Sequence, residues 1–169
     1  MITLDSYLAV ALGGALGAMS RHWINTFVGT RYPTRFPYST LIINVTGSFI
    51  IGLFLTLVNE KISIHPNWRL GFAVGFVGAY TTFSTFEYET FNLIEKGASF
   101  SALANVVISL TLGFVAVWGG IVLARKAGPP LIPQRLSRRA INLETESPKV
   151  DPALIPHTET DEKSTTESR

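Results

Sequence analysis

Four long apolar stretches dominate the chain up to residue 124. They cover residues 7–28, 39–58, 70–94 and 99–124. The segments between them, 29–38, 59–69 and 95–98, carry the proline, glycine and charged residues at which helices stop at an aqueous boundary. Because about 20 apolar residues cross a hydrocarbon core roughly 30 Å thick, each stretch is long enough to span a bilayer once. The pattern therefore predicts four transmembrane helices.

The distribution of charge argues against a soluble helical bundle, whose helices would carry a charged outer face. Only 11 of the first 124 residues are charged, and the stretch 99–124 contains no ionisable side chain. Several aromatic residues near the ends of the stretches are typical of an interfacial belt: Trp23, Tyr32, Tyr38, Trp68 and Trp118. The sequence therefore predicts an all-α integral membrane protein.

The end of the chain has a different composition. Residues 127–169 hold six of the nine prolines, and 15 of the 45 residues from Arg125 onward are charged. We predict a transmembrane unit of residues 1–126 followed by a polar, largely disordered tail, because the tail has too few apolar side chains to bury. The loops carry nearly equal numbers of basic residues on the two sides of the membrane, so only Arg135, Arg138 and Arg139 in the tail favour cytoplasmic termini.

Small and polar residues recur every four positions in two of the stretches. The second stretch has Thr40, Asn44, Ser48 and Gly52, and the fourth has Ser101, Asn105, Ser109 and Gly113. Such a stripe on one helix face allows close helix packing and hydrogen bonding between helices. Two similar stripes without a carboxylate also fit a neutral polar conduit, so the pattern leaves both interpretations open.

The third stretch predicts a broken helix. Gly75 and Gly78 precede the two β-branched residues Thr81 and Thr82, a combination that forms an α-helix poorly. Backbone groups freed at a break are tolerated in a membrane only when they are buried in protein or line a cavity. Freed carbonyls suit a cation such as Na⁺, and freed N–H groups suit an anion. Phe83 and Phe86, three residues apart, share a face where their ring edges could meet an anion or simply pack in a core.

Charged residues are rare inside the stretches. Arg21 is the one basic residue near a span interior, where it could reach the interface, pair with Glu89 or attract anions. No acidic residue lies within a span before Glu87, whereas a proton-coupled exporter needs a titratable group on its substrate path. The chain has no cysteine, which excludes disulfides, cysteine zinc sites and thiol nucleophiles.

Three motifs on separate stretches together resemble the Fluc (CrcB) family of bacterial fluoride channels. They are GGALGAMSR at 13–21, STLIINVTGSFIIG at 39–52 and GAYTTFSTFEYE at 78–89. The resemblance covers about residues 4–126. It implies an antiparallel, dual-topology homodimer of four-helix subunits in the bacterial inner membrane, with two narrow pores for passive fluoride export and a structural Na⁺ at the dimer centre.

The resemblance also implies roles for individual residues. Those expected to line or support ion conduction are Phe83, Phe86, Asn44, Ser109, Thr82 and Asn105. Gly78 and Thr81 would supply backbone carbonyls to Na⁺, and Arg21 and Glu89 would serve the vestibule or the fold. The sequence departs from the family at Asn105, where the family often has tyrosine, at Ser39, where glycine often opens the motif, and in its longer tail.

Other functions fit the pattern less well. A small dual-topology multidrug exporter would need a membrane-embedded glutamate, whereas the first stretch has only Asp5 at its edge. A non-transporting membrane scaffold would use the polar stripes for packing alone. No enzyme is expected, since His22, His65 and His157 lie on different segments and form no cluster with acids at metal-ligand spacing. The expected partners are fluoride, sodium, lipid and a second copy of the chain, and no nucleic acid.

Overall fold

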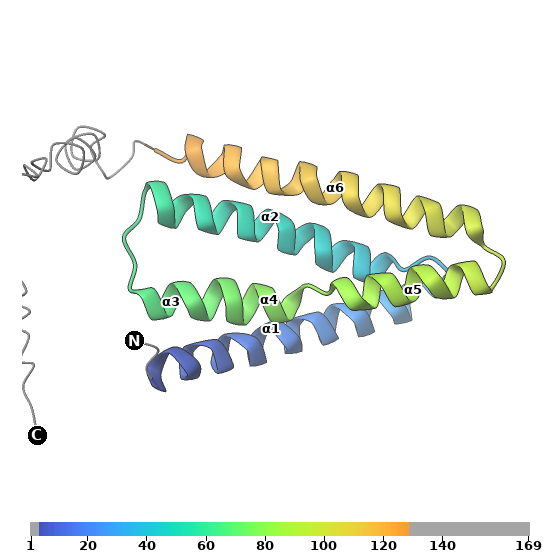
Figure 1. Ribbon diagram of the computed structural model, residues 1–169, viewed down its shortest axis with the longest axis horizontal. Coiled ribbons are helices and arrows are strands. Elements are labelled where there is room, and N and C mark those ends of the chain that lie inside the picture. Colours follow the sequence, from blue (N-terminus) through green and yellow to red (C-terminus); the bar gives the residue numbers. More distant parts are fainter. Residues whose placement is uncertain (1–3, 129–169) are drawn as a thin grey trace, which may run out of the picture. The chain divides into compact units, whose positions relative to one another are not determined.

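The computed structural model describes residues 4–128, which fold into helices without a strand (Figure 1). In chain order the elements are α1 (Leu4–Arg31), α2 (Tyr38–Glu60), α3 (Pro66–Leu70), the π-helix η1 (Gly71–Val77), α4 (Gly78–Tyr80), α5 (Phe83–Glu95) and α6 (Ser99–Lys126). The four predicted stretches are therefore helical, and the third is interrupted as predicted. The tail prediction lies outside the described residues except for 127 and 128.

Two of these helices, α2 and α6, are long and apolar enough to cross a membrane by length and composition among the described residues. α1 has 28 residues, but its glycines and the run Ser20, Arg21 and His22 make it less apolar. The third stretch is divided into short pieces, of which α5 is the longest at 13 residues. By this measure, membrane crossing by α1 and by the interrupted segment stays a prediction.

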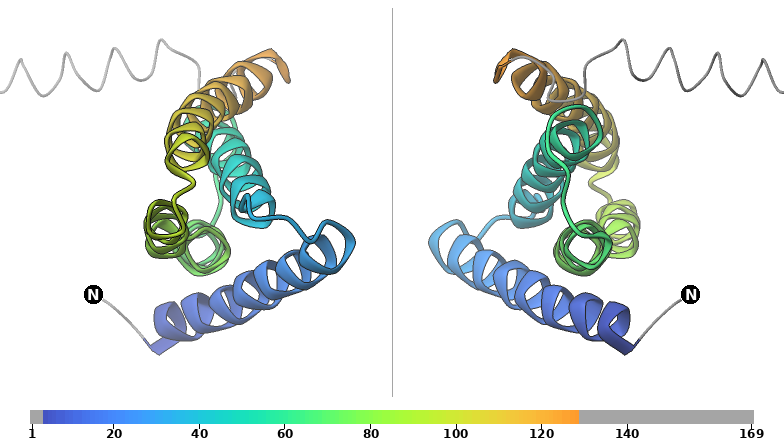
Figure 2. Two further views of the ribbon diagram at one scale, coloured as in Figure 1. Left: turned by 90° about the vertical axis from the view of Figure 1, so that its right-hand side faces the viewer. Right: turned by 90° about the vertical axis from the view of Figure 1, so that its left-hand side faces the viewer.

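Within residues 4–128, α2 lies alongside α6, and α5 lies directly against the beginning of α6 (Figures 1 and 2). α2 packs along α6, α1 packs against η1 and α4, and α5 contacts both α6 and α2. The break between α4 and α5 therefore faces α2 and α6, the two helices that carry the polar stripes.

Glycines bring α1 and η1 into backbone contact. A methyl group on Gly13 would collide with the Gly71 carbonyl oxygen, and one on Gly17 would collide with the Phe76 carbonyl oxygen. Small residues are what allow helix backbones to approach this closely in a membrane. The GxxxG spacing of the first stretch is thus a packing feature, which holds η1 in place just before the break.

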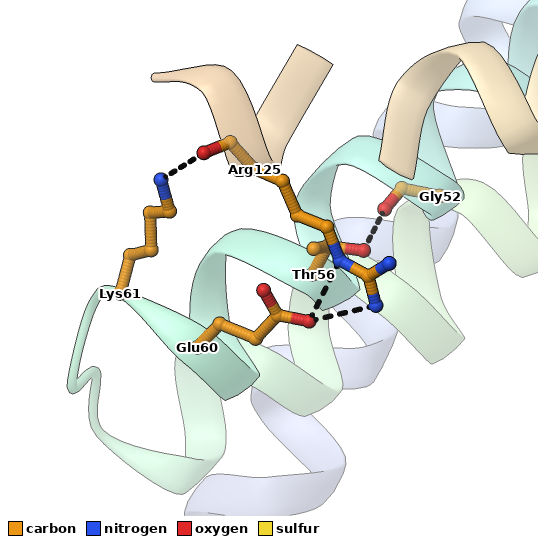
Figure 3. A network of polar contacts seen from close by, with 5 residues as sticks. All are labelled: Gly52, Thr56, Glu60, Lys61 and Arg125. Carbon is orange, nitrogen blue, oxygen red and sulfur yellow. Dashed lines mark hydrogen bonds and ion pairs between the residues drawn. The ribbon is translucent and has the colours of Figure 1, made fainter. Parts of the chain in front are cut away.

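A polar clamp joins the C-terminal ends of α2 and α6 (Figure 3). The Arg125 guanidinium lies 3.1 Å from the Glu60 carboxylate, and the buried Lys61 ammonium donates to the Arg125 carbonyl at 2.6 Å and to the Gly128 carbonyl. The last carbonyls of a helix have no intrahelical donors, and a cation there is favoured by the helix dipole. Lys61 therefore caps α6 and fixes its end against α2.

Candidate functional site

The site forms around the break in the third stretch, where Thr81 and Thr82 leave helical geometry. Thr81 has φ −80° and ψ 159°, and Thr82 has φ −151° and ψ 114°. The Thr81 hydroxyl donates to the Val77 carbonyl at 3.0 Å, which closes the end of α4. The Thr82 hydroxyl accepts a hydrogen bond from the Thr85 N–H and thereby caps α5. Two consecutive threonines thus end one helix and start the next.

Asn44 on α2 binds both backbone groups of Thr82. Its Oδ1 accepts from the Thr82 N–H at 2.9 Å, and its Nδ2 donates to the Thr82 carbonyl at 3.0 Å. In a continuous α-helix the Thr82 N–H would have bonded the Gly78 carbonyl. The Asn44 amide takes over that role, so the Gly78 carbonyl is released from the helix ladder.

A cavity of about 320 Å³ opens beside this contact, between α2, α5 and α6. Its lining residues are Asn44, Ser48, Thr81, Phe83, Phe86, Ser109, Leu110, Gly113, Phe114 and Val117. The lining contains an amide, three hydroxyls and three phenylalanine rings, but no ionisable side chain. The Phe83 and Phe86 rings stand 5.8 Å apart at an angle of 36°, with Phe86 buried and Phe83 exposed over 69% of its surface.

Behind the cavity, Asn105 of α6 is buried, with only 1% of its surface exposed. Its Nδ2 donates to the Thr90 hydroxyl at 2.8 Å, and its Oδ1 accepts from the Ser109 hydroxyl at 3.3 Å. The Thr90 hydroxyl in turn donates to the Phe86 carbonyl at 2.7 Å. Asn105 therefore supports the cavity wall and is not itself among the lining residues.

Glu89 lies at a second cavity, of about 390 Å³, near the start of α2 and the end of α5. Arg35 and Lys96 line the same cavity. The Glu89 carboxyl faces the Thr40 hydroxyl, yet neither Glu89 Oε2 nor Thr40 Oγ1 has a partner within hydrogen-bond geometry. Arg21 is not among the residues lining this cavity, and within residues 4–128 it forms no ion pair with Glu89.

The structure thus sorts the predicted site residues into three groups. Asn44, Thr81, Phe83, Phe86 and Ser109 line one cavity, so the polar stripes of the second and fourth stretches do converge. Thr82 and Asn105 lie just behind its wall, while Gly78, Glu89 and Arg21 lie elsewhere.

Sequence reasoning missed Thr90. It sits four residues after Phe86 and therefore on the same face of α5, a periodicity that could have identified it.

The two polar stripes serve packing as well as the cavity. Asn44, Ser48, Ser109 and Gly113 line it. Gly52, in contrast, is buried where any side chain would lie 2.5 Å from the Val117 carbonyl oxygen of α6. The packing interpretation is therefore confirmed for Gly52, and the conduit interpretation stays a prediction for the members that line the cavity.

Comparison with known proteins places this arrangement in a family. Residues 8–121 match the family described as CrcB-like protein, camphor resistance (CrcB). The chain is 48% identical over 120 residues to a protein of Solibacter usitatus, and 50% identical over 120 residues to one of Acidobacterium capsulatum, both named fluoride-specific ion channel FluC. These alignments cover 71% of this chain and 98% and 96% of the two relatives.

A third relative with the same name, from Sulfurihydrogenibium, is 43% identical over 122 residues, which is 72% of this chain and 98% of that protein. The matched region contains every residue of the cavity and of the break. Its extent and identity leave one assignment: the chain belongs to the CrcB family.

Proposed function

We propose that the protein is a fluoride-selective ion channel that lets fluoride leave the cell passively across the bacterial inner membrane and so limits its toxicity. The observation that carries this proposal is the cavity between α2, α5 and α6, whose lining is polar and aromatic but uncharged. The relatives named above are fluoride-specific channels, which supports the same function. The protein is a channel and not an enzyme.

The lining suits a small, strongly hydrated anion. A fixed cation would hold fluoride too tightly to release it, whereas conduction needs binding that is favourable but weak. The Asn44 amide has a second N–H that makes no hydrogen bond within residues 4–128, and Asn44 lines the cavity. The positive edges of the Phe83 and Phe86 rings add electrostatic attraction without a full charge. Fluoride can thus exchange water for several weak donors in succession.

Two copies would be needed to complete the path. Within one chain the cavity is bounded by three helices, and Phe83 and Phe114, exposed over 69% and 76% of their surfaces, have no wall opposite them among the described residues. A second copy in the antiparallel orientation would supply that wall. The four-span, dual-topology homodimer is therefore part of the proposal, with α1, α2, the interrupted segment and α6 as the spans.

The break also fits a structural sodium ion. Sodium is a hard cation that prefers oxygen ligands, and carbonyls released from a helix supply them. The Gly78 carbonyl has lost its helix donor to Asn44, and Gly78 is exposed. With the Thr81 carbonyl it would give two oxygens per chain. A symmetric pair of breaks would then provide four ligands at the dimer centre.

Fluoride efflux from liposomes tests the function. Purified protein would be reconstituted into vesicles loaded with fluoride or with chloride, and efflux followed with ion-selective electrodes. We expect rapid fluoride efflux without chloride efflux. Phe83→Ile or Phe86→Ile should slow fluoride efflux at least about tenfold, the change that ~1.4 kcal/mol of lost stabilisation produces.

Phe91→Ile is the matched control, because Phe91 lies on the same helix, is exposed and does not line the cavity. This variant should transport fluoride like the wild type. Vesicles that release no fluoride, or Phe83 and Phe86 variants as fast as Phe91→Ile, would contradict the proposal.

A further inference from the structure

The hydrogen bonds behind the cavity have only one possible direction. The Phe86 carbonyl can only accept a hydrogen bond, so the Thr90 hydroxyl must donate its single proton to that carbonyl. The Thr90 oxygen must then accept from Asn105, which fixes the Nδ2 end of the Asn105 amide toward Thr90. Asn105 Oδ1 consequently faces Ser109 and can only accept. Ser109 must therefore donate its proton to Asn105.

This direction has a consequence for the cavity. Ser109 lines it, yet the Ser109 proton is held by Asn105, so the hydroxyl presents oxygen lone pairs to the cavity. Lone pairs repel an anion. An anion can therefore bind Ser109 only if the hydroxyl exchanges Asn105 for the anion.

That exchange requires little reorganisation. The bond from Ser109 to Asn105 Oδ1 is 3.3 Å long, outside the 2.5–3.0 Å range of good O–H···O bonds, whereas the bonds to Thr90 and to the Phe86 carbonyl are 2.8 and 2.7 Å. The weakest of these three hydrogen bonds is thus the one next to the cavity, between Ser109 and Asn105. The two shorter hydrogen bonds, those of Thr90 with Asn105 and with the Phe86 carbonyl, connect the turn of α5 that carries Phe86 to α6.

We infer that Thr90 and Asn105 are positioning residues of the cavity, which hold the Ser109 proton away from it until an anion arrives. This inference rests on the proposed fluoride conduction. It places Asn105 behind the cavity wall instead of on the path of the anion. It also gives a role to Thr90, which the sequence analysis did not identify. The ligand concerned is a small anion that accepts strongly enough to draw the hydroxyl from an amide oxygen.

Removal of the Thr90 hydroxyl is the first test. Thr90→Val keeps the shape of the side chain but can neither accept from Asn105 nor donate to Phe86. We expect fluoride efflux from liposomes to fall about tenfold, the equivalent of ~1.4 kcal/mol. Thr90→Ser, which keeps the hydroxyl, should restore efflux to within about threefold of the wild type. Should Thr90→Val fail to give monodisperse protein, Thr90→Ala removes the same hydroxyl with a smaller side chain.

Thr56→Val is the matched control. Thr56 is buried and, like Thr90, donates to a carbonyl four residues earlier, that of Gly52, at 2.7 Å, but it lies outside the hydrogen bonds that link Thr90, Asn105 and Ser109. Its replacement should leave efflux within about twofold of the wild type, the spread expected of an independent site. Equal efflux from Thr90→Val and Thr56→Val would overturn the inference.

A double-mutant cycle separates positioning from a general structural effect. Thr90 and Ser109 make no direct hydrogen bond, so independent roles predict that the effects of Thr90→Val and Ser109→Ala multiply within about twofold. If Thr90 acts through Asn105 on Ser109, Thr90→Val should slow efflux about tenfold in the wild type but less than about twofold in the Ser109→Ala background. Multiplicative effects would overturn the inference.

The test also separates this inference from the function it rests on. If the wild type releases fluoride and Thr90→Val releases it equally fast, the inference is wrong but the proposed function is not. A wild-type protein that releases no fluoride would contradict the proposed function. Thermal unfolding would then test whether Thr90 and Asn105 are coupled. The melting temperature of Thr90→Val combined with Asn105→Leu should fall no further than that of the worse single variant. If the two decreases in melting temperature add up in the double variant, Thr90 and Asn105 are not coupled.

Discussion

One side chain, that of Asn44, replaces the hydrogen bond that the Thr82 N–H would have made in an unbroken helix, and it donates a further one to the Thr82 carbonyl. A buried backbone group without a partner is costly, and in a membrane no water replaces the lost bond. Asn44 therefore does two things with one amide. It makes the break tolerable, and it leaves one N–H for the cavity that it lines.

Asn44→Ala should accordingly destabilise the fold as well as slow transport. Because the Thr82 N–H loses its partner and the Thr82 carbonyl keeps only its bond within α5, we expect the free energy of unfolding to fall by about 2 kcal/mol. Chemical or thermal unfolding in detergent measures this. Asn59→Ala, at an exposed position near the end of α2, is the control and should change stability by less than about 0.5 kcal/mol. Equal stability of the two variants would show that the Asn44 contact is dispensable.

Residue spacing could predict some of the site and not the rest. The shared face of Phe83 and Phe86 follows from positions three apart on one helix, and the structure places both rings on one cavity. The Asn44 contact joins residues 38 positions apart, so it depends on how two helices pack. Asn105 lies on the same stripe as Ser109, and periodicity alone could not separate a residue on the wall from one behind it.

At the scale of the elements, local composition was informative about where helices stop. Two threonines after Gly78 predicted the break, and it lies at Thr81 and Thr82. The seven-residue π-helix η1 was not predicted, because the residue pattern indicates where the helix is interrupted but does not distinguish a π-helical turn from an α-helical one. It packs against α1, where Gly13 and Gly71 bring the two backbones together.

The contact between α2 and α6 is equally close and offers a matched pair of neighbouring glycines. A methyl group on Gly120 would lie against the Phe49 carbonyl oxygen and 2.7 Å from the Leu53 nitrogen, whereas one on Gly119 would have no neighbour nearer than 4.0 Å. Gly120→Ala should therefore force the helices apart, with a melting temperature below that of the wild type. Gly119→Ala should be neutral or stabilising by up to about 1 kcal/mol, since alanine favours a helix over glycine.

Thermal unfolding of both variants in detergent measures this, with fluoride efflux as a second measurement. A difference between the two variants shows that stability depends on close packing at Gly120 and not on any alanine placed in α6. A Gly120→Ala variant as stable as Gly119→Ala would mean that the α2 and α6 backbones can separate without cost.

For the whole molecule, the distribution of basic residues bears on how the chain inserts. With four spans, Lys61, Arg69, Arg125 and Lys126 would lie on one side of the membrane. Arg31, Arg35 and Lys96 would lie on the other. Basic residues near helix ends set orientation, and a count of four against three, or four against four with Arg21, gives almost no preference apart from the three arginines of the tail. An antiparallel dimer needs such a chain, because both orientations must be made in comparable amounts.

Single cysteines can test this directly, since the native sequence has none. Ser63→Cys places a thiol in the exposed segment after α2, and Thr34→Cys places one in the exposed segment before α2, at the opposite ends of that helix. A membrane-impermeant maleimide applied to intact cells should label about half of each variant, because near-balanced charge allows both orientations. Permeabilised cells give the total for comparison. Full labelling of one variant and none of the other would mean a single orientation, and an antiparallel homodimer could then not form from this chain alone.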